Sequence, residues 1–147
     1  MDHALTPEED ADVPGFWRAL GLPGLAEQYP DLTVIVAHLG APDYGPFLRM
    51  AVDYERVALD TTMVFTGFFD ELAPFPAGAL PLARDLGLAG KILLGSDFPN
   101  IPHPYARQLA GLARLGLGEQ WLRRVCWDNP VALFGAPPGS AEPADGG

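Results

Sequence analysis

Three short apolar runs, each ending in polar residues, constrain the fold of this chain more than any other feature. They are Leu32–Ala37, Val57–Leu59 and the run Lys91–Leu94, in which only the first residue is charged. None shows the alternation of apolar and polar residues expected of a strand with one face in water. Uninterrupted apolar runs are typical of strands that are covered on both faces, as in a parallel sheet. We therefore predict parallel strands near residues 32–38, 57–61 and 91–96.

Segments with helical spacing lie between and after these runs. Apolar residues recur every three or four positions in the stretches 14–28, 45–54, 81–86, 105–115 and 119–128. In the fourth stretch, Leu109, Leu112 and Ala113 would form the apolar face. Asn129 and Pro130 resemble the N-cap and first residue of a last short helix, which glycine at 135 would close. This alternation of strand and helix predicts an α/β fold with a parallel sheet.

The chain length and its last residues bound the domain organisation. A chain of 147 residues is the size of one ordinary domain, and we assign this domain to residues 1–135. Residues 136–147 are rich in proline, glycine, serine and acidic residues. Such a segment cannot bury enough apolar surface to offset the entropy of ordering, so we predict a disordered tail.

The composition argues against several classes of partner. Nine Lys and Arg against nineteen Asp and Glu give a net charge of -10, which repels phosphate backbones and anionic lipids. The single cysteine, Cys126, cannot form an internal disulfide. No apolar run approaches the roughly 20 residues that cross a bilayer, and the first residues lack the features of a signal peptide. We expect a cytoplasmic protein that binds neither nucleic acid nor membrane.

The chemistry-bearing residues lie where the predicted strands end. The first run ends at His38, the second at Asp60, and the third at Ser96 and Asp97. In a (β/α)8 barrel the carboxyl ends of the strands meet at the face where catalysis occurs. Imidazole and carboxylate together suit zinc, iron or manganese, and such a metal lowers the pKa of bound water toward ~7. The alternatives are a structural histidine, a helix cap at Ser96–Asp97 and a loop cap at Asp60.

Four segments resemble the amidohydrolase-related family. Residues 29–40 are similar to its sixth strand, residues 59–62 to its seventh, residues 91–99 to its eighth and residues 129–135 to its closing helix. The resemblance implies the C-terminal half of a partial (β/α)8 TIM barrel, with three to four parallel strands and flanking helices. It also implies a metal-dependent hydrolase that uses a metal-activated water on a C–N or C–O bond, or a decarboxylase of a small organic acid.

The resemblance assigns roles residue by residue. His38 matches the sixth-strand histidine, which binds the metal or polarises the substrate. Asp97 matches the eighth-strand aspartate, which ligates the metal and takes a proton from its bound water. His3 is matched to the fifth-strand histidine as a third metal ligand. We expect contacts to the small-molecule substrate from Asp60, Thr61, Ser96 and Asn100.

The chain departs from the family pattern in one respect. The first-strand His-x-His pair that holds the metal is absent from the sequence, so we expect zinc to be weakly bound or absent. Whether the chain is an enzyme on its own stays open. The alternative is an inactive half-barrel fragment, or an association module that completes a barrel with another chain. Exposed strand edges would favour self-association in either case.

Two further residues receive structural interpretations. His103 lies in a proline-rich loop after the third run and is interpreted as a surface residue or one at the substrate edge, not as a ligand. Cys126 lies on the apolar face of a helical stretch and is interpreted as a core residue, not as a nucleophile.

Overall fold

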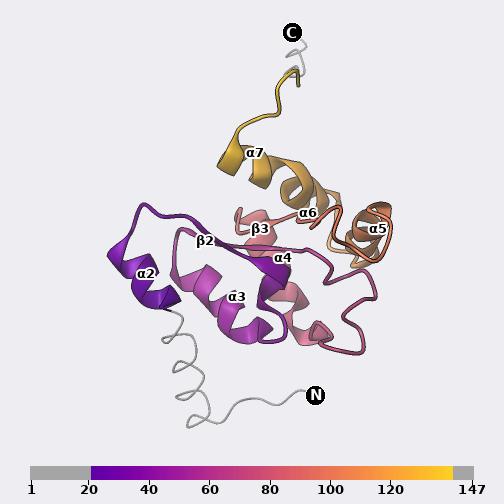
Figure 1. Cartoon of the computed structure of the whole chain (residues 1–147), viewed down its shortest axis with the longest axis horizontal. Coiled ribbons are helices and arrows are strands. Elements are labelled where there is room, and N and C mark those ends of the chain that lie inside the picture. The colour runs from indigo at the N-terminus through magenta and orange to yellow at the C-terminus, as the bar shows by residue number, and fades with distance from the viewer. Residues whose placement is uncertain (1–20, 141–147) are drawn as a thin grey trace.

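Helices and strands alternate along the chain, as the sequence predicted. The computed structural model describes residues 21–140. Its main elements, labelled in Figure 1, are α2 (Leu22–Gln28), β1 (Val34–Val36), α3 (Tyr44–Asp53), β2 (Val57–Asp60), α4 (Leu80–Leu88), β3 (Ile92–Leu93), α5 (Ala106–Arg114), α6 (Glu119–Arg123) and α7 (Asn129–Phe134). Short helical turns cover Ala37–Gly40 and Ala77–Ala79, and a π-helical segment, Arg124–Asp128, joins α6 to α7.

The strands form a three-stranded parallel sheet in the order β1-β2-β3. Val34 lies opposite Val57, and Leu59 lies opposite Ile92. The three apolar runs are therefore parallel strands of one sheet, and this prediction is confirmed. The strands are shorter than predicted: β2 ends at its polar residue, Asp60, whereas β1 and β3 leave the sheet before His38 and Ser96 are reached.

The two faces of the sheet have different surroundings. Val57, Leu59 and Ile92 belong to the hydrophobic core, and the half-buried Val34 and Val36 pack against it. Because side chains alternate along a strand, the other face carries the residues between them in the register, which are Ile35, Ala58, Asp60 and Leu93. A polar strand end thus lies on the face that the helical core does not occupy.

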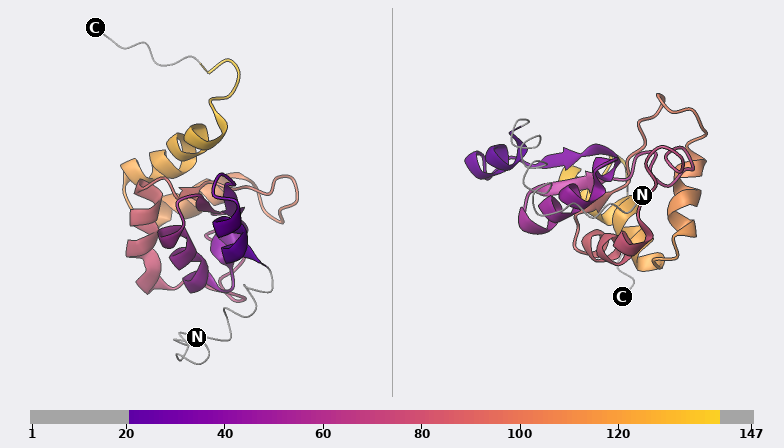
Figure 2. Two further views of the ribbon diagram at one scale, coloured as in Figure 1. Left: turned by 90° about the vertical axis from the view of Figure 1, so that its left-hand side faces the viewer. Right: turned by 90° about the horizontal axis from the view of Figure 1, so that it is seen from below.

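Helices α3, α4 and α6 build the core on the first face. One side of α3 buries Phe47, Leu48 and Ala51, the pattern of an amphipathic helix packed on a sheet. Trp121 of α6 is 1% exposed, and its indole N–H donates a hydrogen bond of 3.1 Å to the carbonyl oxygen of Ala83 in α4. Figure 2 shows the C-terminal helices, coloured orange to yellow, next to α4.

Lys91 fastens the start of β3 to the end of α3. Its ammonium group donates hydrogen bonds to the carbonyl oxygens of Tyr54 at 2.6 Å, Glu55 at 2.6 Å and Val57 at 2.9 Å. Partial burial lowers the pKa of Lys91, and the negative charge of Glu55 opposes this shift. The contact lies at the amino end of the strands, where polar residues serve stability and not catalysis.

The expected N-cap role of Asn129 is wrong. Its backbone is helical, with φ −68° and ψ −46°, because the π-helical segment continues directly into α7. Its buried side-chain amide instead donates to the carbonyl oxygens of Gly87 and Ile92, both at 2.8 Å. The backbone N–H of Leu94 donates to the carbonyl oxygen of Val125 at 2.9 Å. Together these bonds occupy the edge of β3 that faces away from β2.

The end of the chain meets the remaining expectations in part. Gly135 ends α7 with φ 85°, as the sequence predicted. Residues 136–140 are exposed, and the disorder of the whole tail stays a prediction. Within residues 21–140, no helix has both the length and the apolar character needed to span a bilayer.

Replacing Asn129 by alanine should destabilise the fold. The variant removes the donor to the carbonyl oxygen of Ile92 and one of the two donors to that of Gly87, which keeps the N–H of Gly90. The free energy of unfolding should fall by about 1–3 kcal/mol. Urea denaturation followed by circular dichroism measures the change. Asn100 is exposed, so Asn100→Ala serves as the control and should change stability by less than about 0.5 kcal/mol. Equal effects of the two substitutions would contradict the role assigned to Asn129.

Candidate active site

The carboxyl ends of the three strands meet around the side chain of Asp60. Asp60 Oδ1 accepts a hydrogen bond from the backbone N–H of His38 at 3.1 Å and another from that of Thr62 at 3.0 Å. On the side of β3, Gly95 lies against the same group. A Cβ atom at this glycine would collide with Thr62 Oγ1 and would lie 2.8 Å from the carboxyl carbon of Asp60. The structure thus brings residues 38, 60–62 and 95 together, as parallel strand ends require.

His38 lies in a tight left-handed turn directly after β1. Its φ is 58°, and the next residue, Leu39, has φ 51°. Its half-buried ring places Nδ1 2.9 Å from the carbonyl oxygen of Thr62. The ring also meets that of Phe69 edge to face, with 5.6 Å between the centroids. Contacts with two residues of the loop after β2 therefore define the position of the imidazole.

The turn after His38 is stabilised by burial and by a glycine. A left-handed backbone costs a non-glycine residue roughly 1–2 kcal/mol, and Leu39 offsets this cost because its side chain is fully buried. Gly40 follows with φ 84°, and a Cβ atom there would collide with the ring of Phe47. Only glycine satisfies both conditions at position 40.

The threonines after β2 face inward. Thr61 is 3% exposed and Thr62 is 4% exposed. Thr61 Oγ1 accepts a long hydrogen bond of 3.4 Å from the backbone N–H of Gly95. The hydroxyl of Thr61 therefore contributes to joining β2 and β3, and its expected contact with substrate stays a prediction.

Asp97 follows β3 with an exposed side chain. Its φ is 52°, and the side chain has no hydrogen-bond or ion-pair partner among residues 21–140. The Ser96 hydroxyl accepts a hydrogen bond of 3.2 Å from the backbone N–H of Phe98, and Asn100 donates its own backbone N–H to the carbonyl of Asp97 at 2.7 Å. These are turns within the loop, and the next helix begins only at Ala106. The helix-cap alternative for Ser96 and Asp97 is therefore wrong.

The described residues do not make a complete metal site. Among residues 21–140 no group of three His, Cys, Asp or Glu side chains lies close enough to hold an ion. A catalytic zinc usually has three protein ligands and one open position. His3, the third expected ligand, lies outside the described residues. The donors present within this range therefore do not fit a metal by themselves.

Gln108 is a site residue that the sequence patterns did not predict. It is 3% exposed on α5, and its amide accepts a hydrogen bond from the backbone N–H of Met63 at 3.0 Å and donates to the carbonyl oxygen of Ser96 at 2.7 Å. It therefore joins the loops that follow β2 and β3. The sequence placed Leu109 and Leu112 on the buried face of this helix. In the structure Leu109 is 40% exposed, and Gln108 is buried together with Leu112.

The interpretation of His103 as a surface residue is wrong. It is only 8% exposed. Its Nδ1 lies 3.3 Å from the carbonyl oxygen of Pro104, and its buried Nε2 has no hydrogen-bond partner within the described part of the chain. The neighbouring prolines are typical of an exposed loop. In the structure, however, the ring packs against the protein.

Cys126 is half-buried. Burial raises the pKa of its thiol, which keeps the thiol protonated and weakly nucleophilic at neutral pH. This finding agrees with the interpretation of Cys126 as a packing residue.

Comparison with known proteins identifies the family. The profile described as amidohydrolase matches residues 19–136, which is most of the chain. The chain therefore belongs to the amidohydrolase family, whose members generally use divalent metals. The search of curated proteins returns no match.

Replacing Gly95 by alanine should disturb the meeting point of the strands. The new methyl group has no room beside Thr62 and Asp60, so the free energy of unfolding should fall by about 1–3 kcal/mol. Thermal unfolding measures the loss. At Gly45 in α3 a Cβ would meet nothing within 4 Å, and Gly45→Ala should be neutral or stabilising by up to about 1 kcal/mol. A Gly95→Ala protein as stable as the parent would show that the strand ends are less closely packed than described.

Proposed function

We propose that this chain supplies the C-terminal strand ends of an amidohydrolase active site. The reaction would be the hydrolysis of a C–N or C–O bond in a small molecule, or the decarboxylation of a small organic acid. The observation that carries this proposal is the contact of Asp60 with the backbone of His38. It brings a histidine to the carboxyl edge of a parallel sheet, in a chain that belongs to this family.

The proposed roles follow from the chemistry of two side chains. His38 offers a ring nitrogen that can bind a cation or accept a proton. Asp97 offers an exposed carboxylate without a partner among residues 21–140, which can accept a proton from water. A divalent metal, zinc by our proposal, would supply water activation in this family. We assign no step to it, because the described donors do not complete its site.

We propose that the chain is incomplete as an enzyme in isolation. The three parallel strands of residues 21–140 would form part of a (β/α)8 barrel, and further strands would supply the other ligands. His3, Ser96 and Asn100 remain proposed contributors to metal or substrate binding.

Asp97→Asn should abolish turnover while leaving the fold intact. In a complete amidohydrolase barrel containing this segment, loss of the carboxylate should lower kcat by about 10²–10⁴-fold, the usual contribution of a general base. Asparagine tolerates the left-handed backbone at position 97, so the melting temperature should barely change. Turnover is measured on a panel of small amides, esters and carboxylic acids.

A matched variant separates the role of Asp97 from a change of charge. Asp85 is an exposed carboxylate on α4, and Asp85→Asn should retain parental turnover. Near-normal turnover in Asp97→Asn would remove Asp97 from the proposed mechanism. Equal losses in both variants would mean that net charge, not the position of the carboxylate, controls the rate.

The second candidate function is association with another copy of the chain, and the open side of the sheet favours it. Strand β1 lies at one end of the sheet, and its hydrogen bonds, such as that from the N–H of Val34 to the carbonyl oxygen of Arg56, are made on the side of β2. Its other edge is not paired within residues 21–140. Ile35 in this strand is 37% exposed. An unpaired strand edge with an apolar side chain is a template for pairing between chains.

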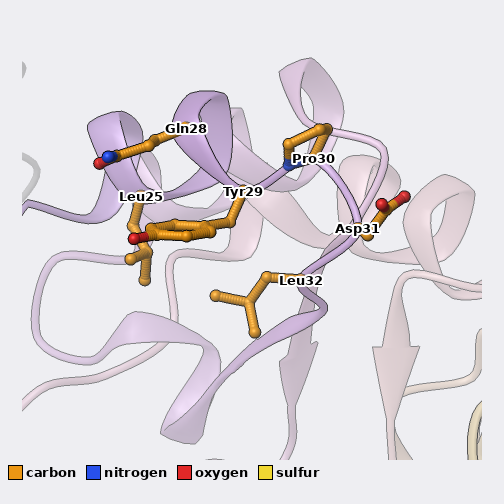
Figure 3. A pocket seen from close by; sticks show the side chains of 6 residues that line it. All are labelled: Leu25, Gln28, Tyr29, Pro30, Asp31 and Leu32. Atoms are coloured by element: carbon orange, nitrogen blue, oxygen red, sulfur yellow. The ribbon is translucent and has the colours of Figure 1, made fainter.

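The approach to β1 continues this apolar surface. A hollow is lined by residues from the end of α2 and the segment before β1, namely Leu25, Gln28, Tyr29, Pro30, Asp31 and Leu32. Figure 3 shows Leu25, Tyr29 and Leu32 turned toward one another there. Tyr29 is 52% exposed and Leu32 is 43% exposed. We propose that a second copy covers this surface together with the edge of β1.

A charge placed on the edge of β1 should prevent this association. Ile35→Lys introduces a solvated ammonium group, a device by which natural edge strands avoid pairing. We expect the parent chain to show the mass of an oligomer by light scattering and the variant to shift toward a monomer. Leu72→Lys is the control, because Leu72 is 74% exposed in the loop after β2. A monodisperse parent monomer would exclude the association.

A further inference from the structure

We propose that Asp60 is a positioning residue for His38, which holds the imidazole as the Nδ1–H tautomer and reserves Nε2 as a lone-pair donor. This inference rests on the proposed function, since it concerns the same site. Asp60 Oδ1 already accepts two backbone hydrogen bonds, and the expected contact of Asp60 with substrate stays a prediction.

The first step of the argument concerns the backbone of His38. The residue has φ 58°, a conformation that needs support from outside the turn. Asp60 supplies this support, because its carboxylate accepts the His38 N–H at 3.1 Å. Hydrogen bonds to an ionised acceptor are stronger than neutral ones. The direction in which the side chain leaves the turn is therefore set by a residue on the neighbouring strand.

The second step concerns the acceptor that faces the ring. The same Asp60 Oδ1 accepts the N–H of Thr62 at 3.0 Å, so Asp60 also orients the peptide of Thr62. The carbonyl oxygen of Thr62 lies 2.9 Å from His38 Nδ1. A carbonyl oxygen can only accept a hydrogen bond, so Nδ1 must carry the hydrogen. One carboxylate oxygen thus positions both the ring and the group that selects its tautomer.

The third step excludes a rotated ring. Turning the imidazole by 180° would place a carbon atom against the carbonyl oxygen of Thr62 and would lose the hydrogen bond. The edge-to-face contact with Phe69, at 5.6 Å between the centroids, further restricts rotation of the ring. The orientation and the tautomer therefore support each other.

The consequence is a definite chemical role for His38. In the neutral Nδ1–H tautomer, Nε2 carries no hydrogen. It can bind a cation or accept a proton or a hydrogen bond, but it cannot donate one. His38 is thereby assigned to electron-pair donation, and the neutral ring is excluded as a hydrogen-bond donor to substrate through Nε2.

The test is nuclear magnetic resonance of the metal-free 147-residue chain with ¹⁵N-labelled histidine. Long-range ¹H–¹⁵N spectra at about pH 8.5, where free imidazole is neutral, report which ring nitrogen carries the hydrogen. We expect His38 to show a protonated Nδ1 and an unprotonated Nε2, opposite to the tautomer that free histidine favours in water. A predominantly Nε2–H ring at His38 would overturn the proposal.

Two variants test the part played by Asp60. Asp60→Ala removes the side-chain oxygen that accepts the backbone N–H groups of His38 and Thr62, and it should shift the His38 ring toward a mixture of tautomers. Asp60→Asn retains an acceptor oxygen and should preserve the Nδ1–H form. Asp85→Ala, at an exposed carboxylate on α4, is the control and should change nothing at His38. An unchanged tautomer in a folded Asp60→Ala protein would show that Asp60 does not position the ring.

A second measurement does not depend on how well the variants fold. In the parent chain, the amide groups of His38 and Thr62 should show scalar coupling through the hydrogen bond to the side-chain carboxyl carbon of Asp60. The proposal would be overturned if either coupling were absent while comparable backbone couplings were visible in the sheet. None of these readouts needs turnover or metal, so the tautomer can be established even if the proposed reaction is wrong, and the reverse also holds.

Discussion

Strand β2 is paired on both edges and buried on both faces, and the rest of the structure depends on its burial. Val57 is 1% exposed, Leu59 is 0% exposed, and Ala58 between them is 7% exposed. Burying a side chain of this kind contributes roughly 1.5–3 kcal/mol, which fixes the register of β1 and β3 against the central strand. Asp60 is the last residue of that strand. The position of its carboxylate is therefore fixed by the packing of the strand in the core.

At the polar end of the sheet, this fixed packing stabilises a backbone turn with unfavourable dihedral angles. His38 and Leu39 both have positive φ, and each such residue costs about 1–2 kcal/mol. The cost is offset on one side by the buried Leu39 side chain and on the other by the hydrogen bond to Asp60. The strained backbone has a structural benefit: the surrounding packing leaves the His38 side chain few other positions, so its location in the site is well defined.

Sequence patterns predicted the strands and their direction, because an uninterrupted apolar run needs cover on both faces and a parallel sheet provides it. They also placed His38, Asp60 and Asp97 at the carboxyl ends of the strands, which meet at one edge of a parallel sheet, and the convergence of the His38 and Asp97 side chains stays a prediction. They could not predict the partners of Asn129 or Gln108, since both side chains bind carbonyl groups that are distant in sequence. The burial of His103 was missed for a related reason: exposure of a loop depends on tertiary packing, which proline content does not report.

The amide of Asn129 has a consequence beyond stability. Its hydrogen bond to the carbonyl oxygen of Ile92, together with the bond from the N–H of Leu94 to Val125, uses the backbone groups on the outer edge of β3. No further strand can pair there while these bonds are made. Continuous growth of a sheet from chain to chain requires two unpaired strand edges on each molecule, one for each neighbouring chain. Within residues 21–140 the outer edge of β3 is occupied and that of β1 is unpaired, so the proposed addition of a strand from a second copy would stop after a single event. If two copies associate through this sheet, as proposed for the second candidate function, the product would therefore be a closed pair and not a fibre.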